Sequence, residues 1–444
     1  YTSKSDEDLF RATTPMKRVI KVSPYDYADR KSVPDYVEKE IASRYTGAIE
    51  TTEGDLTWDE FLALGKDYTE DYMAQEDVNR PVFGAYTSGS TGISKLVIHS
   101  SSNIVATAFQ MSIFIPPSDV PEKWWLPILP PALIAVTVSM AIFPLSAGLI
   151  MVLDPFCPLE DIDIAFMEQK PNFWALIPKY CDLLMNSKRI PEDYDMSHLR
   201  TIGAGAEAMN DRKYAEVEEF FHKHNIKAKL SAGYGQSEGC SNFTLPNPMF
   251  PLEDGCVGMP MPATVLGVFD KDLNELNYGE AGELCMTGPS MMIHYSGWRG
   301  EEMTEKTLIE HPDGNTWLHT GDEAYITEQG IIHILGRGAI RAYGDKPLRV
   351  MRMETKAVRT PGVQDGFFCV VPDMEHEGYF RPYLFVILDG TRTLEEVAEL
   401  LKDTLDEHEY PVEIRVITER PYFHFKTNRK ELTAQILEEL QQVE

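Results

Sequence analysis

A loop rich in glycine and hydroxyl side chains constrains the fold of this chain more than any other stretch. It runs Thr-Ser-Gly-Ser-Thr-Gly-Ile-Ser-Lys over residues 87–95, between apolar runs at 82–86 and 96–98. Two apolar runs joined by such a turn predict paired, buried strands. Glycine lets the backbone approach a ligand closely, and successive N–H groups and hydroxyls can surround one anion. We therefore expect a turn that binds polyphosphate, assisted by Lys95; the alternative is a solvated linker.

The overall charge limits the classes of partner. The 444 residues include 41 basic and 70 acidic side chains, a formal net charge of −29. Such a chain repels nucleic acid and anionic lipid, so neither is expected as a main partner. Its length allows two or more domains with a large core. A polyphosphate ligand would then depend on a local cluster of cations.

Cysteines and apolar runs indicate a reduced, cytoplasmic protein. No Cys-x-x-Cys pair occurs, and no histidine lies at zinc-ligand spacing from a cysteine. We expect buried, reduced thiols. The most apolar stretch, 126–150, contains four prolines, so no membrane span is expected. No signal peptide is expected either, and Tyr1 in place of methionine suggests a trimmed amino terminus. The cysteines are Cys157, Cys181, Cys240, Cys256, Cys285 and Cys369.

Short apolar runs alternate with helical patterns, which predicts an α/β fold of layered, mixed or parallel sheets. The pattern restarts after residue 336. We expect a large α/β domain at 1–337 and a small, mobile α+β domain at 338–444. The predicted strands cover 173–178, 199–203, 367–371, 383–388 and 413–417, and the predicted helices cover 33–44, 57–65, 213–223 and 394–405.

Three later segments carry side chains suited to a nucleotide. Residues 203–207 read Gly-Ala-Gly-Ala-Glu, small enough for a flat ligand to lie on the backbone. In Tyr-Gly-Gln-Ser-Glu at 234–238, the tyrosine ring can stack on a base, the serine can donate to phosphate, and the carboxylate can hold Mg²⁺. In Thr-Gly-Asp at 320–322, the aspartate offers two acceptor oxygens to a diol. Taken singly, each is also compatible with an ordinary turn.

In this order, the motifs resemble those of the adenylate-forming enzymes, which include acyl-CoA synthetases, adenylation domains of peptide synthetases, and luciferases. The family loop reads Tyr-Thr-Ser-Gly-Ser/Thr-Thr-Gly-x-Pro-Lys, and only its proline is replaced, by Ser94. The family pattern Tyr-Gly-x-Thr/Ser-Glu matches 234–238. The resemblance covers about residues 55–444 and lacks the longer amino-terminal subdomain usual in the family.

The resemblance also implies roles for individual residues. Lys426 would be the mobile catalytic lysine, with Lys430 as the rival assignment, and Glu238 would hold Mg²⁺. Two departures concern the small domain: Gly338-Ala339 stands at the hinge, and Phe425 replaces a glycine. The implied catalytic residues are Lys426, Glu238 and Lys95; the implied nucleotide or pantetheine contacts are Thr87, Ser88, Gly89, Ser90, Thr91, Gly92, Gly205, Ala206, Glu207, Tyr234, Gly235, Ser237, Asp322, Arg337 and Gly344.

The implied reaction is ATP-dependent activation of a carboxylic acid to an acyl-adenylate, with release of pyrophosphate and then transfer to the thiol of CoA. The implied cofactors are ATP, Mg²⁺ and CoA. Alternatives are loading of a carrier-protein pantetheine, a non-catalytic nucleotide-binding homologue, and luciferase-like oxidation. Segment 126–136 contains no acidic residue to pair with an α-ammonium, so an apolar acid is expected. Trp124 and Trp125 are expected to be ordinary core.

Overall fold

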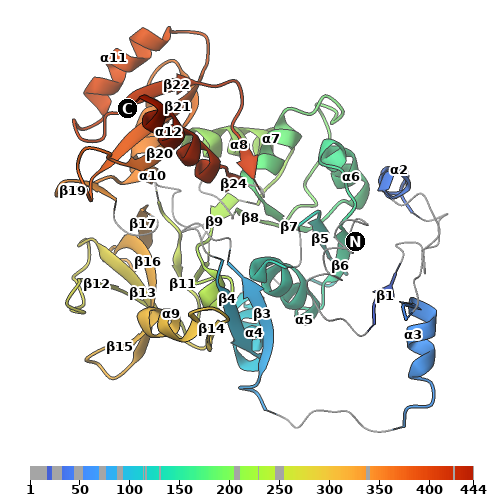
Figure 1. Cartoon of the computed structure of the whole chain (residues 1–444). Helices are drawn as coiled ribbons and strands as arrows, with labels where there is room; N and C mark the ends of the chain where they lie inside the picture. Colours follow the sequence, from blue (N-terminus) through green and yellow to red (C-terminus); the bar gives the residue numbers. More distant parts are fainter. Residues whose placement is uncertain are drawn as a thin grey trace. The chain divides into compact units, whose positions relative to one another are not determined.

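The computed structural model divides the chain into two compact units (Figure 1). One comprises residues 1–76 with 156–161, and the other comprises 77–155 with 162–444. Neither unit begins or ends at residue 337, where the sequence predicts a domain boundary. That boundary stays a prediction, because residues 337–340 lie outside the described part. The structure describes residues 18–22, 33–44, 54–69, 77–87, 94–113, 115, 118–129, 132–204, 211–228, 230–245, 255–336, 341–423 and 426–443.

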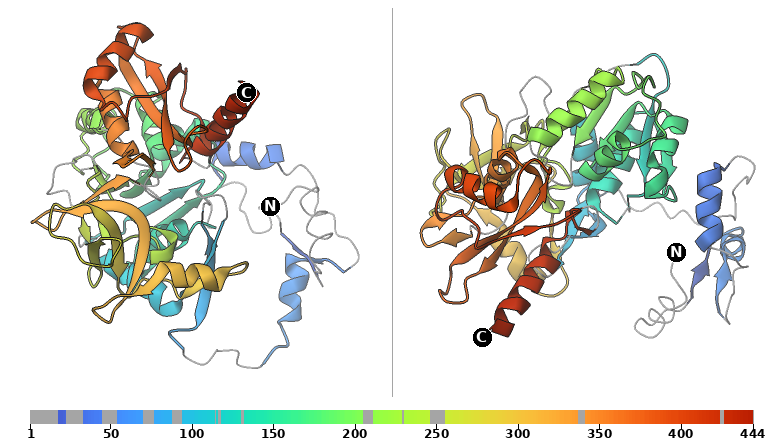
Figure 2. Two further views of the ribbon diagram at one scale, coloured as in Figure 1. Left: turned by 60° about the vertical axis from the view of Figure 1, so that its left-hand side comes forward. Right: turned by 90° about the horizontal axis from the view of Figure 1, so that it is seen from above.

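The smaller unit contains short elements, drawn in blue in Figure 2. Strand β1 (Ile20–Lys21) pairs in parallel with β2 (Leu56–Thr57). Helix α3 follows with a capping box, in which the Thr57 hydroxyl accepts from the Glu60 N–H and the Glu60 carboxylate accepts from the Thr57 N–H. The predicted helices near 33–44 and 57–65 are thus confirmed as α2 (Asp35–Arg44) and α3 (Trp58–Leu64); the 3₁₀ turn η2 (Leu159–Asp161) completes the unit.

A five-stranded parallel sheet forms the first layer of the larger unit, with strand order β6-β5-β7-β8-β9. Its core is aromatic: Trp125, Phe166 and Trp174 pack together and are at most 1% exposed. Trp124 is also buried, so both tryptophans are core as expected. The elements are β5 (Lys123–Pro127), η1 (Ala135–Ile142), α5 (Phe143–Ser146), β6 (Ile150–Asp154), α6 (Ile162–Gln169), β7 (Phe173–Leu176), α7 (Pro178–Met185), β8 (Thr201–Ala204), α8 (Asp211–Lys223) and β9 (Leu230–Ala232).

The apolar runs that flank the glycine-rich loop form two strands, as predicted, and these pair antiparallel. The predicted burial is wrong for the first run, which is an edge strand with Val82 46% and Tyr86 63% exposed. They are β3 (Pro81–Tyr86) and β4 (Leu96–Ser100), and β14 (His294–Ser296) extends the sheet on the other edge of β4. Helix α4 (Ser101–Ser112) begins directly after β4 with a capping box between Ser100 and Asn103. The two strands on either side of the loop are therefore held in a fixed register.

A second sheet has the order β12-β13-β16-β15, with β17 also paired to β16. In the β13–β16 register Cys285 lies opposite His319 and Glu283 opposite Glu323, so residues 320–322 bulge out opposite Leu284. Bulges of this kind redirect a side chain. The elements are β10 (Thr244–Leu245), η3 (Ser237–Gly239), β11 (Met259–Pro260), β12 (Val265–Phe269), β13 (Gly282–Thr287), α9 (Gly300–Thr307), β15 (Leu308–Glu310), β16 (Thr316–Ile326) and β17 (Ile332–Gly336).

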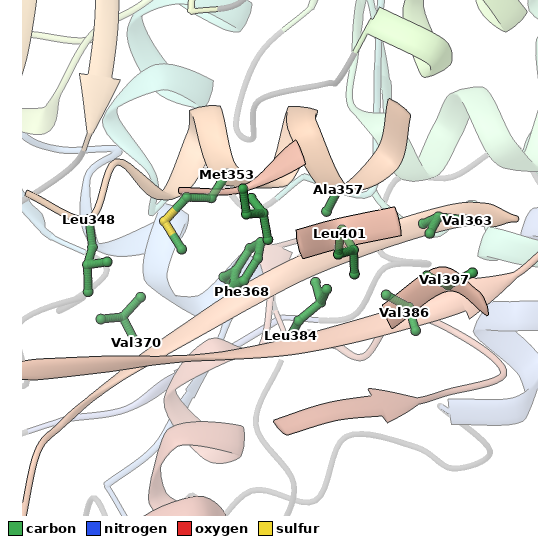
Figure 3. Close-up of a cluster of buried hydrophobic side chains, with 11 residues drawn as sticks. Leu348, Met353, Ala357, Val363, Phe368, Val370, Leu384, Val386, Val397 and Leu401 are labelled. Atoms are coloured by element: carbon green, nitrogen blue, oxygen red, sulfur yellow. The ribbon is translucent and has the colours of Figure 1, made fainter. Parts of the chain in front are cut away.

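Residues 341–443 form an α+β arrangement built on strands β20-β21-β22. Alternate residues of β20 face opposite sides: Phe368 and Val370 pack with helices α10 and α11 (Figure 3), whereas Phe367 and Cys369 pack with Ile436 of α12. The elements are β18 (Ala342–Tyr343), β19 (Lys346–Pro347), α10 (Val350–Arg359), β20 (Val363–Pro372), β21 (Phe380–Leu388), α11 (Leu394–Thr404), β22 (Glu413–Val416), β23 (Tyr422–Phe423), β24 (Lys426–Thr427) and α12 (Arg429–Val443).

Val386 offers a direct test of this core. It is fully buried in the cluster of Figure 3, whereas its neighbour across the sheet, Val416, is 51% exposed. Val386→Ala is expected to lower the free energy of unfolding by about 1.5–3 kcal/mol, because two buried methyl groups are lost and a cavity remains. Val416→Ala should change it by less than about 0.5 kcal/mol. Urea denaturation measures both, and equal losses would contradict the packing described.

The cysteines agree with a further expectation. All six are reduced thiols, and each except the partly exposed Cys256 is buried. Burial raises the pKa of the Cys181 thiol to about 12, which keeps it protonated. Across the described residues, every helix is too short or too polar to cross a bilayer.

Candidate active site

The two ends of the glycine-rich loop are hydrogen-bonded to each other. The Thr87 N–H donates to the Lys95 carbonyl at 2.9 Å, and the Lys95 N–H donates to the Thr87 hydroxyl at 3.0 Å. The Ser94 hydroxyl donates to the Thr87 carbonyl at 2.5 Å. Thr87 and Lys95 thus lie where predicted, at the junction of loop and strands, whereas Ser88, Gly89, Ser90, Thr91 and Gly92 lie outside the described residues.

The segment from Tyr234 to Glu238 is a tight turn that doubles back on residues 240–244. A Cβ on Gly235 would lie 1.7 Å from the Ser241 carbonyl oxygen, so only glycine fits there. Opposite it, Cys240 and Ser241 both have positive φ, 59° and 107°. Such values are uncommon for residues other than glycine. Backbone geometry on both sides therefore holds Ser237 and Glu238 in place.

Asp322 projects from the β16 bulge toward this turn. Its Oδ2 accepts from the Tyr234 hydroxyl at 2.5 Å and from the Gln236 amide at 2.9 Å. The same amide donates to the Thr320 carbonyl at 2.9 Å. The Thr320 hydroxyl stabilises the bulge by donating to the Leu284 carbonyl. The backbone turns at Gly321, which has a φ of 71°. Two motifs 86 residues apart thus form one polar cluster.

Glu238 is connected to Lys95, at the end of the glycine-rich loop, through Tyr295 of β14. The Tyr295 hydroxyl donates to Glu238 Oε1 at 2.6 Å, and the ring lies under Lys95, with Nζ 4.8 Å from its centroid. Burial, followed by the charge of Glu238, raises the pKa of Tyr295, so its hydroxyl keeps its proton. One buried aromatic ring therefore contacts both the predicted loop cation and the predicted metal ligand.

His99 also contacts the turn formed by residues 234–238. It is fully buried on β4, and its Nε2 lies 2.7 Å from the Ser237 carbonyl oxygen. Because a carbonyl oxygen only accepts, Nε2 carries the hydrogen. Burial lowers the pKa of His99, which favours the neutral ring. The strand that follows the glycine-rich loop thus fixes the turn that carries Glu238.

The remaining predicted residues are placed less completely. Gly344 has a φ of 67° in the turn between β18 and β19, a conformation that favours glycine. Lys426 begins β24, opposite Phe423 of β23. Gly336, opposite Glu323, brings the chain beside the Asp322 bulge. The predicted residues Gly205, Ala206, Glu207 and Arg337 lie outside the described residues, as does the side chain of Lys426.

Sequence reasoning missed several supporting residues: Gln236, Tyr295, His99 and Glu283. Gln236 occupies the unspecified position of the Tyr-Gly-x-Ser-Glu pattern, although an amide beside a tyrosine and a serine is a signal for hydrogen bonding. Tyr295 lies in a short alternating strand with no motif of its own. Glu283 accepts from the Gly321 N–H at 2.9 Å, and only the sheet register reveals that proximity.

The family model "AMP-binding enzyme" matches residues 17–296, more than half of the chain. The chain belongs to the AMP-binding enzyme family. Residues 77–87, 94–113 and 234–245 of this AMP-binding enzyme, which supply much of the described cluster, fall within the matched range.

Individual relatives agree with the family. The protein is 27% identical over 319 residues to a long-chain-fatty-acid–CoA ligase of Escherichia coli O157:H7, covering 68% of this chain and 52% of the relative. It is 26% identical over 328 residues to a 4-coumarate–CoA ligase of Pinus taeda, covering 71% and 58%. The chain thus spans about half the length of the curated relatives it matches.

A solved structure confirms the fold. O-succinylbenzoate coenzyme A synthetase (MenE) of Bacillus subtilis, in complex with ATP and magnesium ion, superposes with a TM-score of 0.69 at 18% identity. The match covers 97% of this chain and 82% of that one. The predicted α/β architecture, a large layered domain followed by a smaller α+β domain, is therefore that of the adenylate-forming enzymes.

Proposed function

We propose that this AMP-binding enzyme activates a carboxylic acid with ATP and then passes the acyl group to the thiol of CoA. A carboxylate oxygen attacks the α-phosphorus, the bond from that phosphorus to the β-bridging oxygen breaks, and pyrophosphate leaves. A thiolate then attacks the acyl carbonyl and AMP leaves. The observation that carries the proposal is the convergence of Tyr234, Asp322 and Glu238 on one turn, joined to Lys95 through Tyr295.

In this mechanism the protein mainly positions two anions and offsets their repulsion. Asp322 would accept from the ribose hydroxyls, while Tyr234 and Gln236 hold its carboxylate in place. Lys95, Arg337 and Lys426 would supply positive charge, which a chain of net charge −29 must concentrate locally. Gly344 would lie beside the pantetheine arm in the second step.

The donor set near Glu238 suits Mg²⁺. This ion prefers one or two protein carboxylates and takes its other ligands from phosphate and water. The hydrogen bond from Tyr295 to Oε1 fixes the orientation of the Glu238 carboxylate, and the turn fixes its backbone. When bound, Mg²⁺ would neutralise charge on the leaving pyrophosphate.

The acid is proposed to be apolar, because 126–136 has no carboxylate for an α-ammonium and its described part is rich in buried apolar side chains. The test incubates the purified chain with Mg·ATP, pooled carboxylic acids and CoA, and resolves the products by mass spectrometry. AMP, pyrophosphate and a new acyl thioester are expected. Pyrophosphate with a retained acyl-adenylate would favour a carrier protein as the acceptor. Oxygen consumption would favour a luciferase-like step, and ATP binding without turnover would favour a non-catalytic homologue.

Tyr295→Phe isolates the positioning of Glu238. Removing a hydrogen bond to a charged group costs about 1.5–3 kcal/mol, so the Mg²⁺ concentration for half-maximal activity should rise roughly 10-fold or more. Turnover at saturating Mg²⁺ should change less. Tyr194→Phe is the matched control, because it removes a hydroxyl that donates to the Met167 carbonyl away from the site. An unchanged Mg²⁺ dependence in Tyr295→Phe would refute the assignment.

A further inference from the structure

A second cluster of chemically competent side chains lies on the sheet that carries Asp322. Cys285 of β13 pairs in register with His319 of β16, and His311 follows β15 on the other edge of β16. The potential ligand atoms of these three residues all lie within 4.8 Å of one another. His311 Nε2 and His319 Nε2 are 2.9 Å apart. The spacing of cysteines and histidines in the sequence does not predict this group, because the three residues come together only through the pairing of β13, β16 and β15.

The surroundings of the cluster resemble the support that metal-binding histidines usually have. His319 Nδ1 lies 3.0 Å from Glu283 Oε2, an arrangement that fixes the Nδ1–H tautomer and points Nε2 toward Cys285 and His311. Cys285 is fully buried and His311 is 4% exposed. Phe269 packs edge-on against the His311 ring, with centroids 4.5 Å apart. Two imidazoles and a thiol therefore converge beside the aromatic ring of Phe269.

Hydrogen bonding alone satisfies this group poorly. With Nδ1–H of His319 donating to Glu283, the contact between the two Nε2 atoms must take its hydrogen from His311. The other ring nitrogen of His311, Nδ1, is then an acceptor, and it is buried without a hydrogen-bond partner. A buried polar atom without a partner costs about 1–3 kcal/mol. An ion bound through both Nε2 atoms would replace the direct contact between them; it would not satisfy His311 Nδ1, which would then carry the hydrogen.

We propose that Cys285, His311 and His319 bind a structural Zn²⁺ ion through Sγ, Nε2 and Nε2, with solvent as the fourth ligand. A thiolate and two imidazoles suit zinc and not Mg²⁺, which prefers oxygen. At Zn–N bonds of about 2.0–2.1 Å, tetrahedral geometry separates two nitrogens by ~3.3 Å, so the rings need to move apart by only a few tenths of an ångström. His319, with 10% of its side chain exposed, gives solvent access.

Binding requires chemical changes that the site can accommodate. The Cys285 thiol loses its proton to solvent, and the hydrogen on His311 moves to Nδ1 so that the Nε2 lone pair faces the ion. Burial and the Glu283 charge raise the pKa of the Cys285 thiol in the absence of metal, whereas a divalent cation at bonding distance opposes that shift. The ion would also brace the Asp322 bulge, because Glu283 contacts both His319 and the Gly321 N–H.

The test uses the full chain, stripped with a chelator and titrated with Zn²⁺ by calorimetry and with Co²⁺ by absorption. We expect one tight Zn²⁺ per chain and a Co²⁺ thiolate charge-transfer band with tetrahedral ligand-field bands. Cys285→Ser should abolish the charge-transfer band. Glu283→Gln should weaken Zn²⁺ binding about 10–100-fold, as loss of a supporting hydrogen bond does. Zn²⁺ should raise the Tm of the native chain but not that of Cys285→Ser.

Two controls separate this site from other cation binding. Cys369→Ser removes a buried thiol from another sheet, and Asp373→Asn disrupts a second group with ligand-like spacing, formed by Asp373, Glu375 and His376. Both variants should bind Zn²⁺ as the native chain does. Equal binding by Cys285→Ser, a Co²⁺ spectrum without the thiolate band, or loss of binding in Asp373→Asn would each overturn the proposal. If Cys285→Ser does not fold, His311→Asn replaces it, and its criteria are weaker Zn²⁺ binding and loss of the Zn²⁺-dependent rise in Tm. None of these readouts depends on acid activation.

Discussion

Lys426→Ala should slow acyl-adenylate formation by ~10²–10³-fold while changing ATP affinity only a few-fold, because the lost charge acts chiefly in the transition state. In the proposed reaction, negative charge builds up between the incoming carboxylate and the α-phosphate. A lysine that bridges both groups stabilises that arrangement more than it stabilises bound ATP. The expected signature is therefore a fall in the rate of a single turnover with little change in the dissociation constant.

The structure supports this assignment through the hairpin that carries the lysine. Lys426 lies in β24, and the adjacent Thr427 accepts from the Arg420 guanidinium at 3.0 Å. Arg420 also binds Asp365 through two nitrogens, at 2.6 and 2.9 Å. In contrast, the rival Lys430 lies exposed in the first turn of α12. The backbone at Lys426 is thus anchored, as a catalytic position requires.

Lys430→Ala is the matched control for Lys426→Ala. It removes the same charge four residues away and should leave adenylation within a few-fold of the native rate. Rapid-quench measurement of pyrophosphate gives the rate, and calorimetry with ATP gives the affinity. Lost ATP binding with normal turnover in Lys426→Ala would refute its catalytic role, and a large loss confined to Lys430→Ala would transfer that role to Lys430.

Asp322→Ala should weaken productive ATP binding by ~10²–10³-fold, since each charge-assisted hydrogen bond to a ribose hydroxyl contributes about 1.5–3 kcal/mol. The effect includes the loss of the acceptor for Tyr234 and Gln236, both of which donate to Asp322 Oδ2. Asp322→Asn preserves the shape but replaces one acceptor with a donor. It should fall between Asp322→Ala and the native chain.

Deoxynucleotides show whether the loss arises at the ribose. The native chain should prefer ATP over 2′-deoxy-ATP and 3′-deoxy-ATP, and Asp322→Ala should lose most of that preference, because the missing hydroxyls no longer have a partner. The readout is kcat/KM for each nucleotide. If Asp322→Ala kept the full native preference, the carboxylate would not be the ribose acceptor and would act only through the Tyr234 turn.

Local sequence patterns predicted several of the described elements. The apolar runs around the glycine-rich loop became β3 and β4, and the strand pattern at 383–388 became part of β21. Those predictions rest on periodicity and turn chemistry, which act over a few residues. The division into units was not predicted, because it depends on which distant segments pack together, as residues 156–161 do with 1–76.

The sequence motifs predicted individual residues of the candidate site but not the contacts between them. Tyr234 and Asp322 were both identified, but their direct hydrogen bond was not, because it depends on the β16 bulge. Tyr295 and His99 were missed for the same physical reason: each acts on a turn about 60 or 140 residues away, through a register that only the folded sheets define. The nucleotide contacts implied for residues 205–207 and 337 stay predictions, because these residues lie outside the described part of the chain.

The β16 bulge restricts the length of the chain as well as its composition. Paired residues on either side, Cys285 with His319 and Glu283 with Glu323, fix the register before and after the bulge. Deleting one residue within 320–322 would shift one flank by a single position and turn its side chains to the opposite face of the sheet. Homologous chains should therefore keep the length of this segment, and insertions and deletions should be confined to the connecting loops.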